Sequence, residues 1–234
     1  LRSDAFLAPV ADLARHATGA TEYEVQVGLQ RELPQIVVRS SLQGMALNLP
    51  APLGKAAEVA APLQVAQRLT PAAAADSKSP LQDMLQIHVQ DRASLTYVYD
   101  QTGPQARVTG GWIQLGRDIG PAGAWPAGWN GGPGVQAQAQ LDTLDIDAWR
   151  ALPPPAAEAG RVAPAAPPVP ADVLPYLPQR LGLRVDQLHL HGRVLYDVVA
   201  GLTQSDAIWR GNIQARQLGG YVEYHPPGKT HPQG

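Results

Sequence analysis

The chain contains no cysteine, which excludes disulfides, thiolate catalysis and cysteine-bound metals. Charged residues make up only 16% of the sequence, whereas about a quarter is typical of soluble domains. The net charge is -2 and no basic cluster is present, so nothing attracts nucleic acid. No apolar run approaches the roughly 20 residues that span a bilayer. The remaining composition is that of a weakly charged chain whose polar positions are mostly Gln, Thr, Ser and Asn.

Common catalytic and phosphate-binding motifs are also missing. The sequence has neither a G-x-S-x-G elbow nor an H-E-x-x-H helix. The glycine-rich run 120–134 lacks the Lys-Ser/Thr end of a P-loop, and we interpret it as a long loop. His189 and His191 would point to one side of a strand, but no third ligand stands at a telling spacing, so we expect a solvated pair. Nearby acidic residues are explained by helix capping: Asp142, Asp145 and Asp147. We therefore predict no enzyme activity, no metal and no cofactor.

The most regular pattern in the chain lies between residues 181 and 202, where apolar and polar residues alternate with a period of two. Leu183 and Val185 share one side. Beyond them the phase shifts, so that Leu188 and Leu190 continue the apolar side, as a β-bulge would cause. Gly192 then turns the chain and the alternation resumes. This pattern predicts a half-buried antiparallel hairpin.

The same alternation recurs through most of the chain and predicts a mainly β fold: an extended, twisted antiparallel sheet curled into a groove, with a few short helices. We expect the helices near Phe6, Trp149 and Val173, and loops over 50–62, 71–80 and 120–134. The Ala/Pro-rich segment 153–178 is the best linker. It would separate an antiparallel β module with an N-terminal helix, residues 1–152, from a β meander, residues 179–234, that continues the same sheet. The predicted strands are 23–30, 36–38, 45–49, 63–69, 85–89, 95–99, 106–115, 135–141, 181–202, 207–215 and 220–224.

The apolar stripes have two interpretations that alternation alone does not separate. One is the core of a closed β-sandwich. The other is an open trough that shields lipid acyl chains, each of which costs on the order of 12 kcal/mol when exposed, at roughly 0.8 kcal/mol per methylene. Trp125 and Trp129 in the 120–134 loop offer a contact for lipid headgroups or sugars. We favour the simpler expectation that they fold back over the open edge of the sheet.

A resemblance favours the trough. The run from Ser40 to Val65, SSLQGMALNLPAPLGKAAEVAAPLQV, resembles a stretch of the YhdP family of AsmA-like proteins. GGWIQLG followed by LDTLDIDAWRAL, and the ending LHLHGRVLYDV to LGGYVEY, are similar to that family in the same order. The matching residues of the first stretch are Ser41, Leu42, Gly44, Leu49, Pro50, Pro52, Leu53, Lys55, Pro62 and Leu63.

This resemblance implies a piece from the later part of a very large protein that is anchored in the inner membrane of Gram-negative bacteria and extends through the periplasm. It implies a bridge that moves phospholipids toward the outer membrane along an apolar β-groove. The implied partners are phospholipid acyl chains, the membranes through parts outside this chain, and other envelope proteins. Since the chain starts at Leu1, we expect it to be an internal piece. The groove candidates, chosen by alternation, are Val25, Val27, Leu47, Ile87, Val89, Leu183, Val185, Leu190 and Val198.

Two rivals remain open at this point. The chain could be a closed β-sandwich that scaffolds an envelope assembly, or a carbohydrate-binding module that uses Trp125 and Trp129. An unfilled apolar surface would favour transport over the scaffold. A row of exposed coplanar aromatic rings would favour the carbohydrate module.

Overall fold

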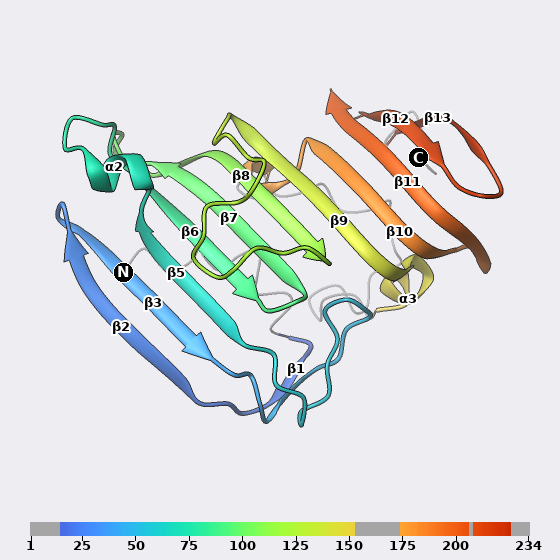
Figure 1. Cartoon of the computed structure of the whole chain (residues 1–234), viewed down its shortest axis with the longest axis horizontal. Helices are drawn as coiled ribbons and strands as arrows, with labels where there is room; N and C mark the ends of the chain where they lie inside the picture. Colours follow the sequence, from blue (N-terminus) through green and yellow to red (C-terminus); the bar gives the residue numbers. More distant parts are fainter. Residues whose placement is uncertain (1–14, 153–173, 206–207, 226–234) are drawn as a thin grey trace, which may run out of the picture.

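The computed structural model describes residues 15–152, 174–205 and 208–225. One eleven-stranded sheet dominates it, in the order β13-β12-β11-β10-β9-β8-β7-β6-β5-β3-β2 (Figure 1). The sheet does not close on itself, so β2 (Tyr23–Gln30) and β13 (Gly219–Tyr224) are its two edges in the described part of the chain. Short strands β1 (Ala17–Gly19) and β4 (Met45–Leu47) form a separate pair. The other strands are β3 (Leu33–Ser40), β5 (Leu63–Leu69), β6 (Gln82–Val89), β7 (Ala93–Asp100), β8 (Arg107–Gly116), β9 (Gly134–Asp145), β10 (Arg180–Leu190), β11 (Arg193–Ser205) and β12 (Ile208–Gln214).

The prediction of a mainly β fold is confirmed, and the sheet is antiparallel as expected except at β9. This strand runs parallel to both of its neighbours, β8 and β10. The reason lies in the connections. A short turn makes the next strand antiparallel, whereas a long connection carries the chain back to the end of the sheet at which the preceding strand began, so that the next strand runs parallel to it. Residues 117–133 make the first crossover, and the second contains α3 (Ile146–Arg150) and the 3-10 helix η1 (Leu174–Tyr176).

Within residues 15–152, 174–205 and 208–225, three short helical segments accompany the sheet. α3 and η1 lie near Trp149 and Val173, as predicted. α2 (Pro71–Ala75) lies in a segment predicted to be a loop, so that prediction is wrong. Its start follows helix chemistry, because the Thr70 hydroxyl accepts a hydrogen bond from the Ala73 amide at 3.3 Å and Pro71 opens the first turn. The helix expected near Phe6 lies outside the described residues, and so does most of the proposed linker.

The side-chain phase of β10 does change, but not through a bulge. Val185 and Leu188 are both buried in one cluster although three positions separate them. The pairing register is nevertheless the same on either side of the change: Val185 faces Val198, and Gln187 faces Tyr196. The same holds against β9. The three strands therefore change phase together, without an inserted residue, in the row that contains Asp142, Asp186 and Asp197.

Two arginines hold the aspartates of this row. Arg117 lies 3.2 Å from Asp142 and 3.1 Å from Asp186, and Arg216 pairs with Asp197. These side chains are about half exposed or more. Exposed ion pairs contribute at most about 1 kcal/mol each. The buried cluster beside the row, rather than the ion pairs, must therefore stabilise this part of the sheet.

Asp147 of α3 fastens the turn between β10 and β11. Its carboxylate accepts hydrogen bonds from the amides of Gly192 at 2.8 Å and His191 at 2.9 Å. These bonds lower the pKa of Asp147. The His191 ring lies 2.6 Å from an Arg150 nitrogen. Among the described residues no group of three His, Asp or Glu side chains is placed to hold a metal ion.

We expect Asp147→Asn to reduce the stability of the protein at neutral pH and to make that stability less sensitive to acid. Because the folded-state pKa is depressed, the carboxylate stabilises the fold above about pH 4 and ceases to do so as the pH falls through the lower folded value. Thermal melts of both proteins across that range should therefore converge at low pH. The control is Asp118→Asn, at an exposed residue that accepts no hydrogen bond from another described side chain or amide. A constant difference between Asp147→Asn and wild type at every pH would contradict this prediction.

Candidate functional site

One face of the large sheet carries an apolar row that crosses all eleven strands. Residues that pair across neighbouring strands lie on the same face, so the register identifies them. We call this side the apolar face, the opposite side the polar face, and this line of residues the central row. Its members are Val25, Val38, Val65, Ile87, Leu95, Ile113, Ala137, Leu181, Leu202, Gly211 and Val222.

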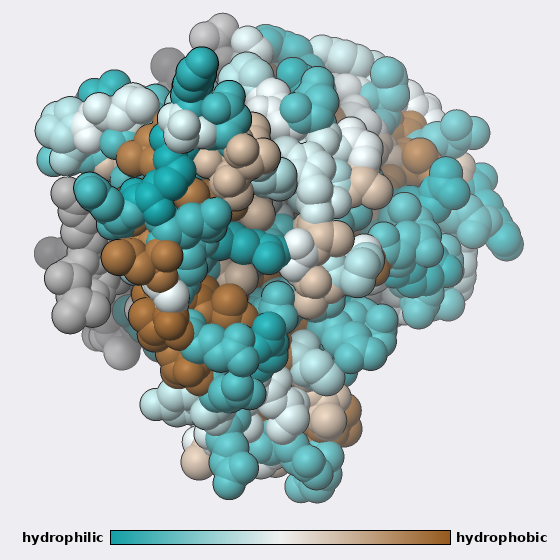
Figure 2. Space-filling model, turned by 60° about the vertical axis from the view of Figure 1, so that its left-hand side comes forward, coloured by the Kyte–Doolittle hydropathy of each residue, from teal (hydrophilic) through white to brown (hydrophobic). Residues whose placement is uncertain are grey.

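Most of the central row is only partly buried. Between β3 and β11 its side chains are partly exposed, apart from the buried Ala137. At the two edges Val25 is 47% exposed and Val222 is 39% exposed. Figure 2, which brings the β2 side forward, shows hydrophobic side chains gathered there among hydrophilic ones. The interior of a closed sandwich would be buried at such central positions, so this face has the character of an accessible surface.

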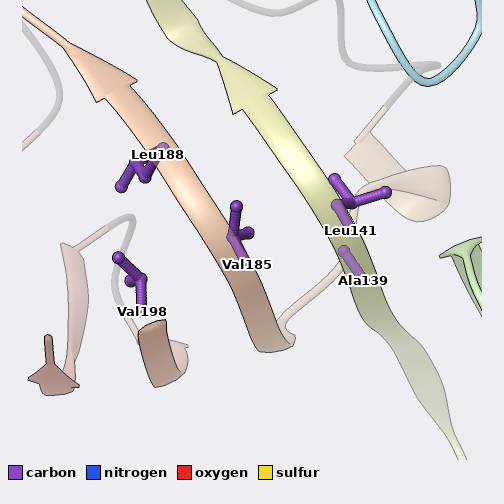
Figure 3. Packing of buried hydrophobic residues seen from close by; sticks show 5 residues of the cluster. All are labelled: Ala139, Leu141, Val185, Leu188 and Val198. Atoms are coloured by element: carbon purple, nitrogen blue, oxygen red, sulfur yellow. The ribbon is translucent and has the colours of Figure 1, made fainter. Parts of the chain in front are cut away.

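The apolar face is covered near both ends of its central strands. At one end Ala139, Leu141, Val185, Leu188 and Val198 form a buried cluster, drawn from three adjacent strands in Figure 3, and Ile146 of α3 packs against it. At the other end Tyr176 of η1 packs on a cluster that contains Tyr97 and Val135. The central row lies between these two covered ends.

The contact with η1 also buries the phenol of Tyr97 and keeps it protonated. Tyr97 and Tyr176 meet edge to face with ring centroids 5.3 Å apart, and the Tyr97 hydroxyl donates to the Tyr176 carbonyl at 3.1 Å. Burial raises the pKa of Tyr97 to about 12, so the phenol is neutral at physiological pH. Tyr97 and Tyr176 therefore cover this end of the apolar face with aromatic rings, and Tyr97 adds no charge to it.

The groove candidates from the sequence fall into four environments. Val185 and Val198 are 0% exposed and belong to a packed cluster, so they are core residues and not an open lining. Val25 and Val27 lie at the exposed edge. Leu47 lies in β4, outside the large sheet. The others, Ile87, Val89, Leu183 and Leu190, are partly buried. Their role in lipid contact stays a prediction. The alternation also marked four central-row residues that the candidate set omitted, Val65, Leu95, Leu181 and Leu202. Val38 and Ile113 lie in predicted strands, but the alternation assigned them no face.

The tryptophan loop lies over the polar face, not over an open edge as expected. It crosses in front of β6, β7 and β8 in Figure 1. Trp129 is only 4% exposed and packs with Met84, Val98 and Trp112. Trp125 stacks on it at 5.0 Å and donates its indole N–H to the Trp129 carbonyl at 2.9 Å. The pair is folded back, but over the middle of the sheet and not over its edge, and it does not form the exposed coplanar row that a carbohydrate module based on it requires.

The stretch that carried the family resemblance owes its shape to Lys55. This lysine is 8% exposed. Its ammonium group donates to the carbonyl oxygens of Leu42 at 2.8 Å, Ala56 at 3.0 Å and Met45. Gly44, in the left-handed region at φ 89°, allows the tight turn beside them, where any Cβ would lie 2.4 Å from the Ala20 carbonyl oxygen. The matching Leu, Gly and Lys residues therefore specify one local structure.

These features define an open, mainly β protein with one apolar sheet face. The sequence model of the YhdP family, described as YhdP protein, matches residues 4–233. The chain therefore belongs to the YhdP family, which confirms the resemblance and indicates an AsmA-like envelope protein. No curated protein and no solved structure matched the chain. Within the residues that the structure describes, no helix is long and apolar enough to cross a membrane.

Proposed function

We propose that this chain is a non-enzymatic segment of a bridge that carries phospholipids between the inner and outer membranes. Acyl chains lie along the apolar face, and the bridge stands in the periplasm as part of a protein anchored to the inner membrane. Membership of the YhdP family supports this proposal. The partners are the phospholipids themselves, with other envelope proteins as further contacts.

The observation that carries the proposal is the partly exposed central row. It continues through β2 to β13 without a charged side chain. With strands about 4.8 Å apart, eleven of them extend the row over roughly 50 Å. The protein needs no conformational change to shield an acyl chain from water, because the apolar face is already accessible. Each methylene that moves from water onto it gains up to roughly 0.8 kcal/mol, which is sufficient to hold an acyl chain.

Site-specific photo-crosslinking tests the proposal. A photoreactive side chain at Leu95 or Ile113 should crosslink to phospholipid in cells, whereas one at Gln138 on the polar face should not. Both central positions are partly exposed, and Gln138 is exposed. Crosslinks of equal strength at all three positions, or at none, would reject lipid carriage on this face.

Ile113→Asp tests whether lipid contact requires an uninterrupted apolar surface. We expect it to reduce lipid crosslinking at Leu95, its cross-strand neighbour, at least several-fold, while the melting transition stays cooperative. The physical reason is that a carboxylate at a partly exposed position stays hydrated and interrupts the apolar surface. The matched control is Gln114→Asp, at the next residue of β8 on the polar face. Unchanged crosslinking in Ile113→Asp would contradict the proposed path.

A further inference from the structure

The polar face is hollowed over β9 to β13, on the side of the sheet opposite the proposed lipid path. Three adjoining hollows of about 250, 310 and 680 Å³ lie there. The first two share Gln138 and Gly182, and the third joins them at Gly201 and Val199. We call this continuous depression the polar trough.

Two glycines form the floor of the polar trough. Gly182 and Gly201 face each other directly across β10 and β11. A Cβ at Gly201 would meet nothing within 4 Å, and one at Gly182 would meet only the Gln138 side chain at 3.7 Å. Neither glycine has a positive φ. The fold therefore does not require glycine here, although glycine weakens a strand. Glycine inside a strand occurs at bulges, at tight bends and where a ligand or another backbone approaches closely. The register shows no bulge between these two glycines, and the space above Gly201 is empty, which leaves room for a ligand.

Amide side chains stand on both sides of this floor. Gln136, Gln138 and Gln140 rise from β9, and Asn212 and Gln214 rise from β12. None of these five side chains makes a hydrogen bond with another residue in the described part of the chain. Each amide offers both donors and acceptors, which is the chemistry that pairs with neighbouring sugar hydroxyls.

The charge of the trough has one sign. Its lining includes Arg180, Arg184 and Arg216 and no aspartate or glutamate. Arg216 pairs with Asp197, whereas Arg180 and Arg184 form no ion pair with any described residue. Two unneutralised guanidinium groups beside a row of amides select a ligand that carries carboxylates as well as hydroxyls.

Aromatic rings stand at the two ends of the trough. Trp112 closes the end of the trough near β8, but it is 4% exposed because it packs with Met84, Val98 and Trp129. Tyr221 lines the opposite end and is 62% exposed. Aromatic faces pack against the apolar faces of sugar rings while their polar atoms bond to hydroxyls.

We infer that the polar trough binds an acidic glycan strand, a polysaccharide whose sugars carry carboxylates. From β9 to β13 the trough crosses five strands, or roughly 20 Å, which accommodates several linked sugars. A lipid path on the apolar face and a glycan on the polar face are separated by the sheet itself. The inference therefore does not depend on the proposed lipid function.

Titration calorimetry of the full chain tests this site with two probes of equal length: an oligogalacturonate, with one carboxylate on each sugar, and a neutral chito-oligosaccharide. We expect the oligogalacturonate to bind and the neutral probe to bind at least about tenfold more weakly. Arg180→Ala with Arg184→Ala should weaken oligogalacturonate binding by about tenfold or more. Both arginines are exposed, so folding should survive.

Gly201→Phe fills the floor of the trough and should abolish binding. Gly28→Phe is the matched control, since Gly28 is also a polar-face strand glycine whose Cβ would meet only the Gln35 side chain, at 3.9 Å. Absence of binding to either probe, equal binding of the neutral probe, or equal losses in the Gly28 and Gly201 variants would overturn the inference. So would vesicles of phosphatidylglycerol that bind with the same arginine dependence, because the trough would then be a membrane contact.

Discussion

Val185→Asp is expected to abolish the cooperative melting transition, whereas Val27→Asp leaves it almost unchanged. Val185 is 0% exposed and pairs directly with Val198, which is also 0% exposed. An aspartate there leaves an unpaired carboxylate in an apolar cluster, which costs several kcal/mol. Because domains of this kind are stable by only about 5–15 kcal/mol, this single change consumes much of the total.

Val27 provides the comparison because it lies on the same face of the sheet but is 72% exposed. Its aspartate stays in water and should change stability by less than about 0.5 kcal/mol. Circular dichroism during heating and during urea titration measures both variants. If Val185→Asp melted like Val27→Asp, the cluster in Figure 3 would not be a packed core, and the boundary drawn here between core and accessible surface would be wrong.

Lys55→Met is expected to lower the free energy of unfolding by about 3 kcal/mol. The methionine retains the apolar stem of the lysine but removes the ammonium group, so the carbonyls of Leu42, Met45 and Ala56 lose a charged donor. The Leu42 and Ala56 carbonyls keep only the long hydrogen bonds from the amides of Met45 and Val59, both at 3.3 Å. Hydrogen bonds to a charged group contribute about 1.5–3 kcal/mol each, and the loss of three partly buried ones is offset in part by the remaining amide donors and by water. The loss should be largest in the segment 41–57, which these bonds hold together.

Hydrogen exchange locates the effect of Lys55→Met. The amides of Gly44 and Leu47, which donate to Ala57 and Lys55 at 2.8 and 2.9 Å, should exchange faster in the variant than in the wild type. Lys78→Met is the control, since Lys78 is exposed, and it should alter stability by less than about 0.5 kcal/mol. Equal stability of the two variants would show that the ammonium group does not hold this segment.

Alternation in the sequence was sufficient to predict the strands of the large sheet, although it missed the short β1 and placed Leu47 on the wrong surface. Val65, Ile87 and Leu181 lie in separate strands, yet all three fall in the central row. This succeeds because side chains alternate between the two faces of a strand, whatever the strand pairs with. The order of the Leu, Gly, Pro and Lys motifs was likewise sufficient to indicate the family.

Only the tertiary structure decided strand direction and depth of burial. The parallel pairing of β9 depends on two long crossovers, whose course no local pattern encodes. Val25 and Val185 have the same alternation, but one is exposed and the other is core, because Ile146 and Leu188 pack beside Val185 alone. The polar trough likewise needs Gly182 and Gly201 in register across two strands. The sequence pattern determines to which side of its strand each residue points. Burial and strand neighbours depend on residues that are distant in the sequence and come together only in the folded sheet.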